Sequence, residues 1–197
     1  MSDEILRCAT EDEFAAWLEA NHRNATEVWL ALPKKGTAVP SVTRSEALDV
    51  ALCYGWIDGK AFSGNVPDGW WAQRFSPRRA RSPWSQINVA RVAQLTAAGR
   101  MRPAGLAQVE QAKADGRWAA AIAPPSEAET PPDLLAALDG TPAAAAAYAK
   151  LSRSIRYQIL LNVERAKKPE TRTRRIDMFV GRLAAGEPPL GPVRRSS

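Results

Sequence analysis

Residues 56–102 read WIDGKAFSGNVPDGWWAQRFSPRRARSPWSQINVARVAQLTAAGRMR, and the class of fold expected for the chain follows from this segment. No aspartate or glutamate occurs from Gly69 to Val109, whereas seven arginines do: Arg74, Arg78, Arg79, Arg81, Arg91, Arg100 and Arg102. The first half also contains five large aromatic residues: Trp56, Trp70, Trp71, Phe75 and Trp84. Guanidinium groups make forked bonds to oxyanions and stack on flat rings, so this composition favours a surface that binds an anionic or aromatic molecule.

Two strands are predicted within the segment, at 56–62 and 70–75, joined by the turn-rich sequence SGNVPDG. If Phe62 faces Trp70 in this hairpin, antiparallel pairing places Asp58 opposite Arg74. The hairpin is therefore expected to hold one carboxylate beside an arginine.

A helix is predicted to follow the hairpin, because Ser82-Pro83 has the pattern of an N-cap followed by a first-turn proline. It should run from Pro83 to about Ala98. One side would carry Trp84, Asn88 and Arg91, and the side suited to the core would carry Ile87, Ala90 and Leu95.

The N-terminal flank predicts a helix, a strand and a second helix. Residues 11–23 have apolar positions at helical spacing, and residues 27–33 alternate as a strand does. Thr43-Arg-Ser-Glu46 has the spacing of a capping box and opens a helix that Gly55 closes.

The C-terminal flank is predicted to be entirely helical, with a helix ending near Gly116, short helices at 133–138 and 142–151, a helix capped by Ser154 and a last helix at 170–185. The expected class is α+β, with a small three-stranded antiparallel sheet and helices in the first half and helices alone in the second. The expected domains are 1–102, an α+β half, and 103–186, a helical half packed on it. Residues 187–197 are expected to form a disordered tail.

The whole chain of 197 residues carries a net charge of +6, which is unevenly distributed. Residues 153–175 form a second basic segment, and the remainder is net acidic, an asymmetry that points to an anionic partner. Cys8 and Cys53 are too few for a disulfide framework, and no apolar run approaches the roughly 20 residues that span a membrane. With no secretory signal at the start, we expect a cytoplasmic protein without membrane insertion.

Four blocks, in the order ALCYGWIDG, RFSPRRARSPWSQIN, GRMRPAGLAQVEQAKADGRW and AKKPETRTRRI, resemble the YdeI/OmpD-associated family, also called the bacteriocin-protection or OmdA-type family. The resemblance extends from about residue 11 to residue 187. It implies a role in protection against antimicrobial peptides or envelope stress. It supplies no catalytic residues to transfer to this chain.

Catalytic candidates are few. Asp58 would be the acid or base of an enzyme, although a neighbouring arginine would weaken it as a base. His22, the only histidine, follows an exposed helix, and one histidine with two distant cysteines does not make a zinc site. There is no glycine-rich phosphate loop. The sequence therefore predicts no cofactor and no metal, and leaves open whether a reaction is catalysed.

The leading hypothesis is a protein that binds a small anionic or aromatic ligand in a cleft lined by tryptophan and arginine, between the hairpin and the helical half. The expected ligand-binding residues are Trp56, Asp58, Trp70, Trp71, Arg74, Arg78, Arg79, Arg81, Trp84 and Asn88. One alternative is a nucleic-acid-binding protein, with phosphates along the arginines and bases on the tryptophans. The other is an enzyme in which Asp58 acts with arginines that stabilise an oxyanion.

Overall fold

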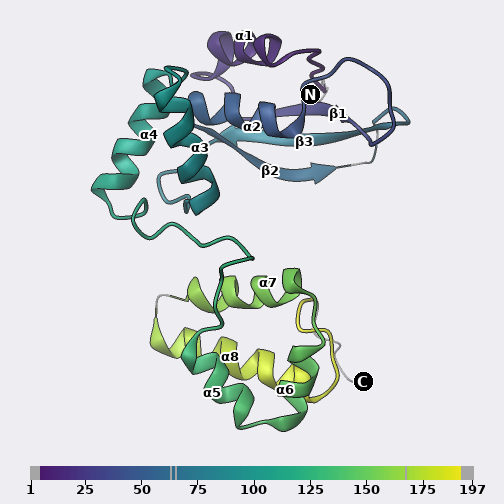
Figure 1. Cartoon of the computed structure of the whole chain (residues 1–197), viewed down its shortest axis with the longest axis vertical. Helices are drawn as coiled ribbons and strands as arrows, with labels where there is room; N and C mark the ends of the chain where they lie inside the picture. Colours follow the sequence, from purple (N-terminus) through teal and green to yellow (C-terminus); the bar gives the residue numbers. More distant parts are fainter. Residues whose placement is uncertain (1–4, 63, 65, 167, 192–197) are drawn as a thin grey trace. The chain divides into compact units, whose positions relative to one another are not determined.

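The computed structural model describes residues 5–62, 64, 66–166 and 168–191, and the chain divides into two units, Met1–Ile122 and Ala123–Ser197 (Figure 1). The predicted α+β class is confirmed in the described residues, since the strands of the sheet lie in the first unit and the second unit is helical. The sequence placed the boundary at residue 102, whereas the contacts divide the chain after Ile122. The segment 103–122 therefore belongs with the sheet.

The sheet contains β1 (Val28–Pro33), β2 (Trp56–Phe62) and β3 (Trp70–Pro77), in the order β1-β3-β2 with both pairings antiparallel. β3 is the central strand, and its Ala72, Gln73 and Phe75 are buried.

The predicted hairpin register is wrong. Asp58 lies opposite Phe75 rather than Arg74, and Phe62 lies opposite Ala72 rather than Trp70. The register shifts between Asp58 and Ala61, which indicates a bulge that a simple count of paired residues misses.

Among its described residues, the first unit also contains four helices: α1 (Glu11–Asn21), α2 (Arg44–Cys53), α3 (Gln86–Ala97) and α4 (Pro103–Ala114). The capping box predicted at Thr43 is confirmed, because its side chain accepts from the Glu46 N–H while the Glu46 carboxylate accepts from the Thr43 N–H. Helix α2 packs against α1 and β2, and one core joins the helices to the sheet (Figure 1).

Helix α3 begins later than predicted. Ser85, rather than Ser82, is its N-cap, and its hydroxyl accepts from the Asn88 N–H. The residues before it are held extended, because the Ile122 N–H donates to the Trp84 carbonyl at 2.9 Å. The helix consequently presents a different face: Val92 and Leu95 are buried, whereas Ile87 and Ala90, expected in the core, are exposed.

The second unit contains α5 (Pro132–Asp139), α6 (Pro142–Ala149), α7 (Arg153–Glu164) and α8 (Pro169–Ala184), which share their own core. Ser152, rather than Ser154, caps α7. Residues 187–191 of the predicted tail are structured: Pro189 is buried and its carbonyl accepts from Arg182 Nη1 at 3.1 Å. Residues 192–197 lie outside the described residues.

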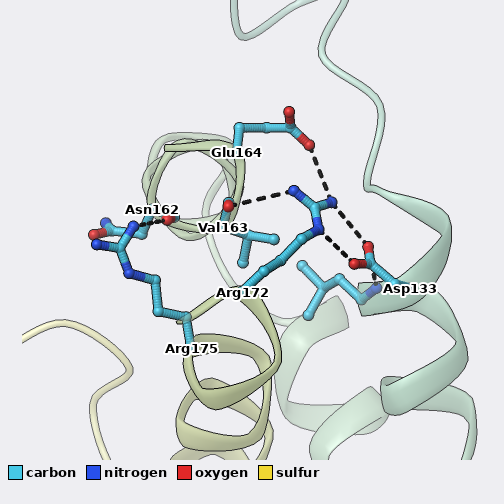
Figure 2. Close-up of polar contacts among 7 residues, drawn as sticks. Asp133, Asn162, Val163, Glu164, Arg172 and Arg175 are labelled. Carbon is cyan, nitrogen blue, oxygen red and sulfur yellow. Dashed lines mark hydrogen bonds and ion pairs between the residues drawn. The ribbon is translucent and has the colours of Figure 1, made fainter. Parts of the chain in front are cut away.

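Arg172 connects three helices of this unit (Figure 2). From α8 its Nε lies 2.5 Å from Asp133 Oδ2 on α5, and its Nη2 lies 3.0 Å from Oδ1 of the same carboxylate. The guanidinium also reaches Glu164 Oε1 at 3.2 Å and donates to the Val163 carbonyl at 3.3 Å, both on α7. Hydrogen bonding to Arg172 lowers the pKa of Asp133, while the same bonds raise the pKa of Arg172.

Much of the basic charge of α8 is used inside the unit. Arg175 Nη1 donates to the Asn162 carbonyl, beside the Arg172 network (Figure 2). Arg182 donates to two carbonyls of the segment that follows the helix. These guanidinium groups therefore serve the packing of the second unit.

Replacing Arg172 with alanine should lower the free energy of unfolding of the second unit by about 1–3 kcal/mol, because charge-assisted hydrogen bonds between three helices are lost. The matched control is Arg174→Ala, which removes the same group from an exposed position on α8. The pKa of Asp133 is lower in the folded protein than in the unfolded chain. Its ion pair with Arg172 therefore stabilises the fold fully above the unfolded pKa, and this stabilisation is lost as the pH falls through the folded pKa. The difference between wild type and Arg172→Ala should therefore shrink in acid. Hydrogen exchange of the α8 amides measures both the loss of stability and its pH dependence. Equal protection in Arg172→Ala and Arg174→Ala would contradict a stabilising role for Arg172.

Candidate functional site

The tryptophans proposed as ligand walls differ in exposure. Trp56 is 1% exposed, packs edge-on against Trp17 with ring centroids 6.0 Å apart, and donates from Nε1 to the His22 carbonyl. Trp70 and Trp71 are half-buried, and the Arg7 guanidinium lies 4.9 Å from the Trp70 ring centroid. Trp56 is thus a core residue, whereas Trp70 and Trp71 keep part of their surface in solvent.

Several arginines of the acid-free segment are paired with carboxylates from other parts of the same unit. The three pairs have N···O distances of 2.6–2.7 Å: Arg74 with Glu27, Arg91 with Asp49, and Arg100 with Glu11. The cationic charge left for a partner is therefore smaller than the sequence count suggests.

Asp58 is paired with Arg44, a residue of α2, at 2.6 Å, and not with Arg74. Its side chain is 18% exposed. The carboxylate is engaged in this ion pair, so the observed geometry gives the proposed catalytic role no support.

The turn between β3 and α3 separates the remaining candidates. Arg79 and Arg81 are exposed, and Asn88 is half-buried in the first turn of α3. By contrast, Arg78 is only 6% exposed, although its neighbour Arg79 faces solvent. The turn thus directs one arginine inward and two outward.

Arg78 lies over the Trp84 ring, with its guanidinium carbon 3.8 Å from the ring centroid. Its Nη2 donates to the Pro83 carbonyl at 2.6 Å. Within the described residues, three nitrogens have no hydrogen-bond partner: Nε and Nη1 of Arg78 and Nε1 of Trp84. Three buried donor atoms therefore lie close together without acceptors.

Arg117 and Trp118, which follow α4 in the chain, complete this arrangement. Arg117 Nη1 donates to the Ser82 carbonyl at 2.9 Å, and the Trp118 ring packs edge-on against Trp84 at 4.8 Å. We call Arg78, Trp84, Arg117 and Trp118 the Arg78 cluster. Neither Arg117 nor Trp118 is among the ligand-binding residues expected from the sequence, because only the pairing of Ile122 with the 84–86 segment brings them to Trp84.

The electrostatics of the Arg78 cluster favour an anion. Burial above all, and then the positive charge of Arg117, lower the pKa of Arg78 to about 10, and the negative charge of Asp58 opposes this shift. Arg78 is still protonated at neutral pH. A buried guanidinium with unsatisfied donors is costly unless an acceptor reaches it, and an oxyanion supplies both acceptors and countercharge.

Two pockets of the first unit share Tyr54 and Arg102. The smaller, of about 220 Å³, also contains Asp12 and Arg100, and the larger, of about 420 Å³, contains Glu19. Both mix the two signs of charge, and the Tyr54 hydroxyl donates to Glu19 at 2.9 Å. The Arg78 cluster also contacts a carboxylate, because Arg117 is paired with Asp115 at 2.7 Å, but Arg78 itself has no carboxylate partner among the described residues.

No cluster of three or more metal-ligating side chains occurs in the part of the chain that the structure describes. In the same residues, no helix combines the length and apolar character needed to cross a bilayer.

Comparison with known families divides the chain in nearly the same place as its contacts do. The family model described as a domain of unknown function, DUF8412, matches residues 6–108. The model described as bacteriocin-protection, YdeI or OmpD-associated matches residues 127–186, which supports the resemblance over the second unit only. The first two blocks ascribed to that family lie in the other match, and the third, residues 99–118, lies in it only in part. No curated protein and no solved structure matches the chain.

Proposed function

Because this chain belongs to the DUF8412 family and carries a bacteriocin-protection, YdeI or OmpD-associated region after it, we propose that it is a protection protein whose first unit binds a small oxyanion at the Arg78 cluster. The ligand class is a phosphate, a sulfate or a carboxylate group of a small molecule.

The observation that carries this proposal is the buried guanidinium of Arg78. Arg78 is 6% exposed and has two nitrogens without an acceptor among the described residues, beside the equally unpartnered Nε1 of Trp84. A structural arginine would be expected to satisfy its donors with backbone carbonyls or a carboxylate. A binding site in which a ligand oxygen accepts from these nitrogens would account for their lack of partners.

The small size of the ligand follows from the same burial. The Trp84 ring is occupied by Arg78 on one side and contacts Trp118 at its edge, so it offers little surface to an aromatic guest. The proposal is therefore narrower than the anionic or aromatic ligand expected from the sequence. The donor atoms are closed to solvent in this structure, so a neighbouring side chain has to move before the end of an anionic group can reach them.

The protective role rests on the family description of the second unit. We place the activity in the cytoplasm, because Cys8 and Cys53 are buried free thiols, as is usual in a reducing compartment.

A titration of the full chain with phosphate, sulfate and acetate, at constant ionic strength set with chloride, tests the proposal. All seven tryptophans lie in the first unit, so their fluorescence reports that unit alone. We expect a saturable change in fluorescence and a rise in the melting temperature with an oxyanion but not with chloride. The exposed Lys60→Gln variant, which also loses one positive charge, should respond as wild type does.

A flat response to every oxyanion would remove the proposal. Binding of an oligonucleotide that weakens steeply with salt, without a saturable response to free oxyanions, would instead favour the nucleic-acid alternative.

A further inference from the structure

A further pocket lies wholly within the second unit. It has a volume of about 230 Å³, and the residues that give it chemical character are Ser126, Thr130, Tyr148, Arg153, Arg156 and Tyr157. The segment 125–130, the end of α6 and the first half of α7 form its walls. The volume is below the roughly 300–1,000 Å³ usual for drug-sized ligands, so the pocket suits a small molecule.

The charge of this pocket has one sign. Arg153 and Arg156 stand three residues apart on α7, a spacing that places them on the same side of the helix. No carboxylate is among the described residues that line it. The first turn of α7 contains no acidic residue, so the positive end of its helix dipole is not countered locally.

The hydroxyl groups add at least one donor. The Tyr148 side chain is more than nine-tenths buried, and its hydroxyl lies 3.1 Å from Thr130 Oγ1. Only one of these two hydroxyl hydrogens can lie between the two oxygens, so the other remains available to an acceptor. The Tyr157 hydroxyl already donates to the Ala123 carbonyl at 2.8 Å, which fixes its ring as a wall.

From this combination we propose that the second unit binds a small phosphate monoester, with Arg153 and Arg156 on the phosphate and the two tyrosine rings beside the organic group. Phosphate is favoured over carboxylate because two guanidinium forks and a hydroxyl supply more donors than two carboxylate oxygens use well. This site is independent of the Arg78 cluster.

The test is a nuclear magnetic resonance titration of the full chain with phenyl phosphate, inorganic phosphate and benzoate. We expect saturable shifts confined to the amides of residues 125–130, 148 and 153–160. Phenyl phosphate should bind most tightly, and Arg156→Gln should weaken it at least tenfold. The matched control, Arg174→Gln on α8, should bind as wild type does, and the tryptophan fluorescence should not report this event.

Two results would overturn the proposal. Equal weakening by Arg156→Gln and Arg174→Gln would show attraction to general basic charge. Equal affinity for phenyl phosphate and benzoate would show that the site does not select a phosphate. A variant Arg78→Met, which changes only the first unit, should leave this pocket intact, so loss of binding at the first site can be distinguished from loss at this one.

Discussion

Replacing Arg78 with methionine is expected to abolish the oxyanion response of the first unit, with affinity weakened at least about 30-fold, while the ligand-free protein stays as stable as wild type or becomes more stable. The loss of affinity follows from removing a buried, charged donor that faces the ligand, a change that typically costs about 2–5 kcal/mol. The gain in stability follows because methionine fills a similar volume without unsatisfied donors.

The lowered pKa of Arg78 also supports the expected gain in stability of Arg78→Met. The folded pKa of Arg78 is lowered to about 10, so the folded state disfavours the charged side chain at every pH below that value. Since the unfolded chain binds this proton more tightly, the wild-type protein should gain stability as the pH rises from about 10 toward the unfolded value. Arg78→Met should lack that gain.

Chemical denaturation followed by tryptophan fluorescence measures stability, and oxyanion titration measures binding. Arg78→Lys keeps the charge but not the fork, and should bind weakly while remaining folded. A methionine variant destabilised by more than about 2 kcal/mol that still binds the oxyanion would assign Arg78 a purely structural role.

The second large effect is expected at Gly105, where alanine should destabilise the first unit by about 3 kcal/mol. Gly105 is buried in α4, against the end of α2. A Cβ placed there would lie 2.2 Å from the Cys53 carbonyl oxygen and 2.8 Å from the Leu52 carbonyl oxygen. Both are backbone atoms, so α4 would have to move away from α2.

Gly181 on α8 provides the control. It is exposed, and among the described residues no atom outside its chain neighbours and the adjacent helix backbone lies within 4 Å of a Cβ built there. Gly181→Ala should therefore stabilise the second unit by about 0.5–1 kcal/mol, through helix propensity alone. Tryptophan fluorescence should detect the first substitution and not the second, and an unchanged unfolding midpoint for Gly105→Ala would show that the helices separate at little cost.

The sequence predicted the elements of this fold better than their pairing. Local signals such as the capping box at Thr43 were sufficient to predict the helix α2 and where it begins. The hairpin register was not predicted, because the bulge between Asp58 and Ala61 depends on how β2 fits against β3. The start of α3 was missed because Ile122, far along the chain, holds the residues before it extended.

The candidate site could be predicted only in part. Arg78 and Trp84 are close in sequence, and their neighbourhood was identified by its lack of acids. Nothing in that pattern distinguishes Arg78 from the exposed Arg79, because burial depends on tertiary packing. Arg117 reaches Ser82 across 35 residues, and the partner carboxylates Glu27 and Glu11 come from still more distant segments.

The pairing of Ile122 with residues 84–86 also determines where the protein can be divided. A fragment that ends at residue 102 would lose Arg117, Trp118 and Ile122 together. Trp84 would then lack the packing contact that Trp118 makes with its ring. Limited proteolysis should instead release a stable N-terminal piece whose last residues lie just beyond 122, and that piece would be the smallest one worth crystallising with an oxyanion.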